Sequence, residues 1–266
     1  MYEEFWGLKE KPFENTPDPR FLYNSNQHEE ALSRLLYVIR ERKGAGMLTG
    51  VFGCGKTLIA KTILAELGRD IYRVSLVTNP RLNDVELLRM IGYQLGGEVL
   101  QTTKSDVLIS LENVLLNNIR DGKNTVVIID EAHSIENREV FEEIRLLLNF
   151  QHEDKFLLTV LLLGQPELRE KIDANKQLSQ RIALKYHLQG LSKEEAGFYI
   201  EHRIKVAGGK KDIFKQEAKE LIFENSAGIP RRINQICDMA LFLGFGKKIK
   251  SVEKEMVRES LAGLEG

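Results

Sequence analysis

The residues best suited to chemistry stand together in the stretch GVFGCGKT, which begins at Gly50 and ends at Thr57. Its glycines allow a tight loop whose backbone N–H groups turn inward and bind anionic oxygens. Lys56 adds a cation, and the Thr57 hydroxyl is a ligand for a divalent cation. The stretch therefore predicts a loop that binds the phosphates of ATP with Mg²⁺, formed by Gly50, Phe52, Gly53, Cys54, Gly55, Lys56, Thr57 and Leu58.

Two carboxylates, Asp130 and Glu131, directly follow the apolar run VVII at 126–129. A buried parallel strand delivers the residues that follow it to the edge of the sheet where ligands bind. We expect Asp130 to hold Mg²⁺ together with Thr57, and Glu131 to act as the general base that takes a proton from water. A general base for water favours ATP hydrolysis. The nearby His133 is interpreted either as a polar residue at the start of a helix or as a residue that contacts the catalytic side chains.

Three further side chains are candidates for the same chemistry. Gln165 follows the apolar run 156–163, where an amide can orient the attacking water. Arg181 lies in LSQR before the last predicted strand, and Arg231 lies in GIPRRIN at the start of a helix. From the residues alone, each arginine is equally well explained as surface charge.

The elements that must position these residues alternate between strand-like and helical patterns as far as about residue 190. Strands separated by helices predict a parallel sheet that is covered on both faces, which is an α/β fold. The predicted strands are 47–49, 71–77, 126–129, 156–163 and 186–188. The predicted helices are 27–42, 57–67, 84–95, 106–120 and 138–150.

From Leu191 the pattern becomes helical only. The residues Ser192 to Glu195 form a capping box that opens a helix. We predict helices at 193–207, 215–225, 230–245 and 253–261. The chain should therefore contain an α/β domain over residues 1–190, which includes an irregular Pro-rich arm to about Ser25, and a small helical domain over residues 191–266.

The composition excludes several classes of protein. The chain has 266 residues, 42% of them hydrophobic, with 38 basic against 39 acidic side chains and a net charge of −1. Such a balance gives no global field that attracts nucleic acid or an anionic membrane. Its longest apolar run is far shorter than the roughly 20 residues of a membrane span. The N-terminus does not resemble a secretory signal, so we predict a cytoplasmic protein.

The motifs GVFGCGKT, VVIIDEAH, LGQPEL, LSQR and GIPRRIN, in this order, resemble the plan of the AAA+ ATPases. The arm MYEEFWGLKEKPFENTPDPRFLYNS resembles more narrowly the family of general secretion pathway protein A and its short relatives of exosortase and exopolysaccharide loci. The resemblance covers essentially the whole chain. It implies a P-loop AAA+ core, with three αβα layers around a parallel sheet, followed by a small helical lid domain.

The resemblance also implies roles for the remaining candidates. Gln165 would be the sensor 1 residue, and Arg231 would be the sensor 2 residue that reaches the γ-phosphate. Arg181 would be an arginine finger offered to the ATP of a neighbouring subunit, which implies a homo-oligomer whose subunits share ATP sites. The arm would lie near the adenine, with Phe13 or Tyr23 as its contacts.

Three functions remain open from the sequence. The favoured one is an ATPase that drives or regulates assembly of a cell-envelope secretion system through nucleotide-dependent oligomerisation, with an inner-membrane or envelope protein as partner. The first alternative is a DNA-acting AAA+ ATPase such as a transposition accessory factor, with Arg231, Arg232 and the basic run at 246–250 as DNA contacts. The second is a scaffold that uses ATP only as a structural ligand.

The long relatives carry a transmembrane segment and a periplasmic peptidoglycan-binding region, and neither follows the lid in this sequence. We therefore expect either a part of a longer protein or a stand-alone member. A stand-alone member would reach the inner membrane peripherally, through its partner.

Overall fold

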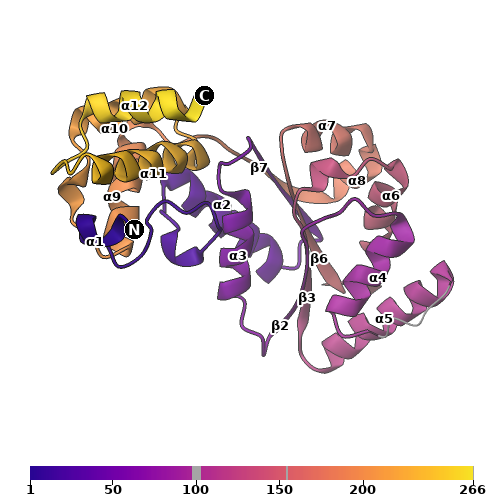
Figure 1. Cartoon of the computed structure of the whole chain (residues 1–266). Coiled ribbons are helices and arrows are strands. Elements are labelled where there is room, and N and C mark those ends of the chain that lie inside the picture. Colours follow the sequence, from indigo (N-terminus) through magenta and orange to yellow (C-terminus); the bar gives the residue numbers. More distant parts are fainter. Residues whose placement is uncertain (98–102, 154, 266) are drawn as a thin grey trace. The chain divides into compact units, whose positions relative to one another are not determined.

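The computed structural model describes residues 1–97, 103–153 and 155–265. The chain divides into two compact units (Figure 1). The sheet unit consists of Glu29–Phe52 and Ile59–Leu188. The helical unit consists of Met1–His28, Gly53–Leu58 and the chain from Gln189 onward. Among the described helices, none combines the length and the apolar character needed to cross a membrane.

The sheet unit is built on five parallel strands in the order β2-β3-β6-β1-β7. This arrangement confirms the predicted α/β fold with a parallel sheet. Because all neighbours are parallel, the C-terminal ends of the strands lie at one edge of the sheet. The strands are β1 (Ala45–Gly50), β2 (Tyr72–Val77), β3 (Asn124–Ile129), β6 (Leu158–Gly164) and β7 (Ile182–Leu188).

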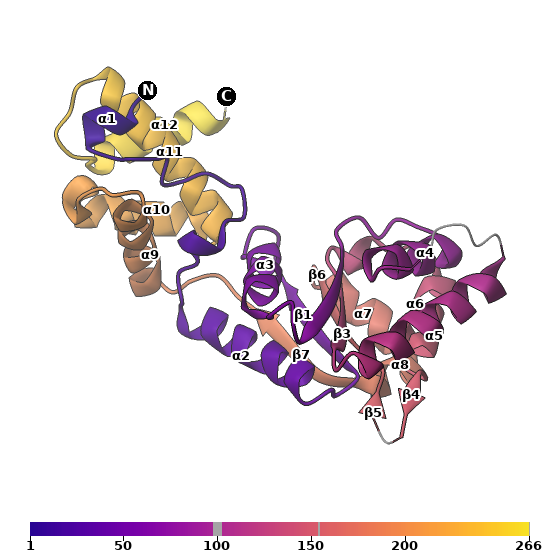
Figure 2. The same cartoon turned by 90° about the horizontal axis from the view of Figure 1, so that it is seen from below.

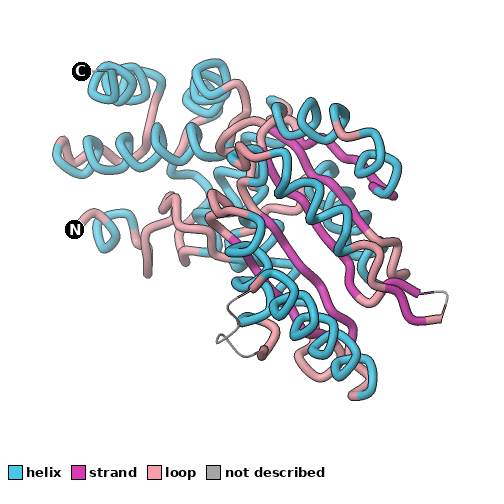
Figure 3. The backbone as a smooth tube through the Cα atoms, turned by 90° about the vertical axis from the view of Figure 1, so that its right-hand side faces the viewer, coloured by secondary structure: helices cyan, strands magenta, loops and turns pink. Residues whose placement is uncertain are grey.

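Both faces of the sheet are buried, as its continuous apolar strands predict. In β3, Val127 and Ile129 join the main apolar core. Their neighbours Val126 and Ile128 point to the opposite face and are equally inaccessible to solvent. Figure 3 shows the strands between helices on both sides.

The helices that lie wholly or mostly in the sheet unit range from single turns to segments of about four or five turns. They are α2 (Asn26–Arg40), α3 (Lys56–Glu66), α4 (Asp84–Gln94), α5 (Lys104–Arg120), η2 (Ala132–Ser134), α6 (Arg138–Leu147), α7 (Glu167–Ala174) and α8 (Lys176–Arg181). A short hairpin of β4 (Gln151–His152) and β5 (Lys155–Phe156) follows α6 (Figure 2).

The helical unit contains segments from both ends of the chain. Figure 1 shows the N-terminal segment beside the C-terminal helices, and the apolar cluster of this unit includes Tyr2, Trp6 and Phe21 of the arm. The Trp6 indole donates a hydrogen bond to the Leu241 carbonyl at 3.0 Å. The elements are α1 (Glu3–Trp6), η1 (Pro19–Phe21), α9 (Lys193–Val206), η3 (Lys211–Ile213), α10 (Gln216–Ser226), α11 (Pro230–Gly246) and α12 (Lys254–Glu265).

A buried arginine in α9 ties the arm to these helices. Arg203 donates hydrogen bonds to the carbonyls of Pro12 and Glu14, and its guanidinium lies 4.8 Å from the centre of the Phe21 ring. A buried charge is tolerated only when its donors are satisfied, as they are here. The arm, which is predicted to belong to the domain of residues 1–190, thus packs with the C-terminal helices. The domain boundary at residue 190 stays a prediction.

Candidate functional site

The predicted phosphate loop directly follows β1 and leads into the first turn of α3, as the motif requires. Gly53 and Gly55 have φ angles of 84° and 107°, in the region that side chains disfavour. A Cβ atom on Gly53 would lie 2.6 Å from Cβ of Arg231, and one on Gly55 would lie 3.0 Å from Nε2 of His28. Crowding and backbone angle together require glycine at both positions.

Two carbonyls of the loop are held from outside. The Gly53 carbonyl accepts a hydrogen bond from the Arg231 backbone N–H at 3.2 Å. The Cys54 carbonyl lies 2.9 Å from Nε2 of His28. In a trans peptide the C=O and the following N–H point in opposite directions, so the N–H groups of Cys54 and Gly55 are turned to the other side. Successive N–H groups turned to one side form an anion-binding concavity.

The remaining loop residues occupy the positions that the sequence predicts. Lys56 is the first residue of α3 and is buried, and Thr57 and Leu58 follow in the same helical turn, whose N-terminus favours anions. The thiol of Cys54 is also buried, and this burial raises its pKa. Phe52 is exposed.

The two carboxylates leave the C-terminal end of β3. Asp130 is 2% exposed, and its Oδ1 accepts a hydrogen bond from the Glu131 N–H at 2.9 Å. Glu131 has a left-handed backbone, with φ 53° and ψ 30°. For a residue other than glycine this conformation costs about 1–3 kcal/mol, and such strain is concentrated at functional sites.

Gln165 follows the neighbouring strand β6 and contacts the residues after β3. Its Nε2 lies 2.9 Å from Nε2 of His133. Because the amide nitrogen donates, the imidazole Nε2 accepts and the ring proton lies on Nδ1, which is 3.4 Å from Oε2 of Glu131. His133 therefore lies between two predicted catalytic side chains, which agrees with the second of its two interpretations from sequence.

The close approach of these segments depends on Gly164 at the end of β6. A Cβ atom there would lie 3.0 Å from the backbone nitrogen of His133. Lys171 of α7 holds the same segment, since its ammonium donates to the carbonyls of His133 and Ile135 at 2.5 and 2.7 Å. These contacts fix the position of η2, and with it the His133 ring.

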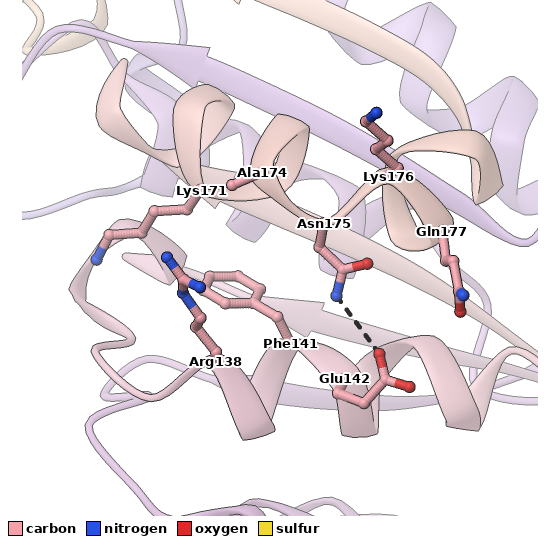
Figure 4. A pocket seen from close by; sticks show the side chains of 8 residues that line it. All are labelled: Arg138, Phe141, Glu142, Lys171, Ala174, Asn175, Lys176 and Gln177. Carbon is pink, nitrogen blue, oxygen red and sulfur yellow. Dashed lines mark hydrogen bonds between the residues drawn. The ribbon is translucent and has the colours of Figure 1, made fainter.

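Lys171 also lines a cavity of about 460 Å³ between α6 and α7–α8 (Figure 4). Arg138 and Phe141 of α6 lie on the opposite wall from Asn175. The Asn175 amide donates to Glu142 at 3.5 Å, and Lys171 is bonded to the η2 carbonyls. Asn175 and Glu142 thus bind each other across the cavity, Lys171 binds η2, and we interpret the region as support for η2.

The two candidate arginines differ in their surroundings. Arg231 follows Pro230 in the first turn of α11, and its backbone contacts the phosphate loop. Arg181 ends α8 and donates to the Leu148 carbonyl at 2.9 Å and to Oδ1 of Asn149 at 2.6 Å. It therefore binds the C-terminal end of α6, where a cation is favoured.

The two candidates for adenine contact, Phe13 and Tyr23, differ in their exposure to solvent. Phe13 is 2% exposed and packs edge-on against Phe214, with ring centres 5.9 Å apart. Tyr23 is partly exposed, and its ring centre lies 5.7 Å from that of His202. Of the two, only Tyr23 therefore has accessible surface that an adenine could contact.

His28, which holds the loop, was missed from sequence. It is buried, and it lies 26 positions from the Cys54 carbonyl that it contacts. A serine three residues before it, Ser25, is a signal for a helix start. That signal says nothing about what the ring of His28 contacts.

The helical unit should lose stability in mild acid. Burial lowers the pKa of His28, although the Cys54 carbonyl and Glu195 oppose the shift. Burial also lowers the pKa of His202, with Arg203 and Lys205 acting in the same direction. The unfolded chain therefore binds more protons than the folded chain as the pH falls below the ordinary histidine value of 6.5, and folding stability present above that pH is lost.

Thermal unfolding measured between about pH 8 and 5 tests this expectation. The midpoint should fall below the ordinary histidine pKa, and His28→Gln should reduce the slope. A midpoint that is independent of pH in this window would contradict it. The carboxylates with lowered pKa values, such as Asp84 and Glu142, titrate below their ordinary values of 3.8 and 4.5, outside this window.

Comparison with known proteins gives a family and two curated relatives. Residues 39–172 match the family described as AAA domain. The chain is 38% identical over 250 residues to General secretion pathway protein A of Aeromonas hydrophila, covering 93% of this chain and 45% of that protein. It is 24% identical over 156 residues to an uncharacterized HTH-type transcriptional regulator of Methanocaldococcus jannaschii, covering 56% and 38%. The chain thus spans less than half of either relative.

Several solved structures share the fold. The ORC2 protein of Aeropyrum pernix in ADPNP–ADP complexes aligns with a TM-score of 0.73 at 21% identity, covering 96% of this chain and 71% of that chain. Drosophila ORC bound to DNA aligns at 0.74 and 20%, covering 99% and 66%. The RuvB Holliday junction branch migration motor of Thermotoga maritima aligns at 0.58 and 18%, covering 92% and 70%. Identities this low establish the fold alone.

Proposed function

Because this chain belongs to the AAA+ ATPases, through the AAA domain at residues 39–172, and is similar to General secretion pathway protein A, we propose a specific activity for it. It hydrolyses ATP with Mg²⁺ and thereby drives or regulates assembly of a cell-envelope secretion system. The family had been expected from the motifs, and the match confirms it. The proposal rests chiefly on the phosphate loop, whose held carbonyls turn successive N–H groups to one side.

Each predicted side chain has a proposed role. Lys56 and Arg231 bind the phosphates, and Gln165 orients the attacking water. Glu131 takes the proton from that water as its oxygen bonds to the γ-phosphorus, and ADP leaves with the bridging oxygen. Thr57 and the buried Asp130 would hold Mg²⁺, which supplies charge neutralisation at the phosphates. Hard oxygen donors of this kind suit that ion.

The assembly role is inferred from the similarity to General secretion pathway protein A, and it rests on the proposed Arg181 finger. Through that finger, hydrolysis would depend on a homo-oligomer. The partner would be an inner-membrane or envelope protein of the secretion system, which would also hold the ATPase at the membrane.

DNA is the alternative partner. Drosophila ORC is solved bound to DNA, and RuvB is described as a Holliday junction branch migration motor. In this chain the exposed Lys248 and Lys250 offer a local cationic surface, but Lys247 is paired with Glu259. One acidic side chain, Glu259, therefore neutralises one charge of the basic run, which favours secretion over DNA.

An ATPase assay over a range of protein concentrations tests the proposal. We expect Mg²⁺-dependent ATP binding, and a specific rate that rises with concentration and is unchanged by duplex DNA. A rate that duplex DNA stimulates at about 50 mM salt, and less at about 200 mM, would instead support the DNA function. If ATP does not bind to the folded chain, the proposed function is wrong.

A further inference from the structure

We propose that His28 is a positioning residue of the phosphate loop, and that its ring N–H sets nucleotide affinity by fixing the peptide between Cys54 and Gly55. This inference rests on the proposed ATP binding and deepens it. His28 is not expected to touch the nucleotide. It acts through the loop carbonyl that it holds 2.9 Å from its Nε2.

Only one assignment of donors and acceptors fits the hydrogen bonds around His28. The Cys54 carbonyl can only accept, so Nε2 must carry the proton. In the neutral ring Nδ1 is then an acceptor, and it receives the Ser25 hydroxyl at 2.7 Å. The same hydroxyl oxygen accepts from the His28 backbone N–H at 3.4 Å. Ser25 therefore both begins the helix and selects the ring tautomer that binds the loop.

The loop needs an external restraint at this peptide. Gly55 tolerates positive and negative φ almost equally, so its own backbone does not decide which way the preceding peptide faces. If the peptide turned over, the Cys54 carbonyl would face the phosphates in place of the Gly55 N–H. That turn would exchange a favourable contact for repulsion between oxygens.

The hydrogen bonds to the two loop carbonyls differ in whether a substitution can remove them. The Gly53 carbonyl is bound by the backbone N–H of Arg231, which survives almost any substitution there. The Cys54 carbonyl is bound by a side chain. The orientation of the second peptide therefore depends on the residue at position 28.

The affinities of His28 variants for MgADP and MgATP, measured by calorimetry, distinguish the effect of the hydrogen bond from the effect of the volume that the ring fills. His28→Phe fills the site without a donor and should weaken both ligands about tenfold, the value of one net hydrogen bond. His28→Gln keeps an amide donor and should restore affinity to within about threefold of the wild type. The exposed His152 is the matched control, since His152→Phe should leave affinity unchanged.

Two results overturn the proposal. One is that folded His28→Phe binds nucleotide as well as the wild type does. The other is that His28→Gln weakens binding as much as His28→Phe does, which would show that a hydrogen-bond donor at this position does not set affinity. If the wild type itself binds no nucleotide, it is the proposed function that fails.

Ring-nitrogen NMR of labelled histidine in the wild-type chain gives a test that needs no variant to fold. The expected signature for His28 is a neutral ring with its proton on Nε2, which persists in mild acid. A proton on Nδ1 at neutral pH would show that the ring does not donate to the loop, and would overturn the proposal.

Discussion

Replacing Glu131 by Gln should lower the maximal rate of ATP hydrolysis by about 10²- to 10⁴-fold, the usual contribution of a general base. The amide keeps the shape of the side chain but does not accept the proton of the attacking water. Affinity for MgATP should stay within about threefold of the wild type, because this role concerns the transition state. Phosphate release and calorimetric binding measure the two quantities.

The structure offers a matched control for this change. Glu139 is an exposed acid in the first turn of α6, and Glu139→Gln should leave the rate unchanged. Equal rates for Glu131→Gln and the wild type would remove Glu131 from the mechanism. A Glu131→Gln variant that also loses ATP affinity would point instead to damage at the strained left-handed position.

Replacing Arg181 by Ala should lower hydrolysis by about 10³- to 10⁵-fold in the assembled protein, if Arg181 is a finger for a neighbouring ATP. Affinity of each subunit for ATP should be kept. A local effect is also expected, because Arg181 binds the Leu148 carbonyl and Asn149 in its own chain. Loss of these contacts alone should lower the thermal midpoint, so the unfolding of the variant is measured beside its rate.

Mixing variants separates the two roles of Arg181. Arg181→Ala keeps Glu131, whereas Glu131→Gln keeps Arg181, so an interface between the two contains one complete set of groups. Activity of the mixture well above the sum of its parents is expected for a finger that acts between subunits. A mixture that gives only that sum would restrict Arg181 to its contacts with α6.

Much of the fold could be predicted because local patterns determine it. The buried strand β3 is a continuous apolar run, and α9 opens with a capping box that the structure contains. The strand β7 extends from residue 182 to 188 although only 186–188 were predicted. Its inner residues alternate between exposed and half-buried positions, so it lacks the continuous apolar run that marks β3. The short helix α1 was missed, since Trp6 is held by long-range contact with Leu241.

The residues of the candidate site likewise fall into those that local sequence patterns identify and those whose contacts depend on the fold. Glycine spacing identifies the phosphate loop, and the end of an apolar strand identifies Asp130 and Glu131. The contacts of His28 and His133 depend on segments that only folding brings together, so local sequence does not reveal them. The roles of Gln165, Arg181 and Arg231 stay predictions, and the Arg181→Ala variant tests one of them.

The composition of the helical unit has a consequence for synthesis on the ribosome. Its parts are the N-terminal arm, the short segment Gly53–Leu58 and the chain from Gln189 onward. Such a unit has high contact order, because its folding must close loops over most of the chain. The sheet unit ends at Leu188 and can form first. Until α11 emerges, the nascent chain would therefore carry a phosphate loop that lacks the Arg231 contact to the Gly53 carbonyl, which delays nucleotide capture to the last stage of synthesis.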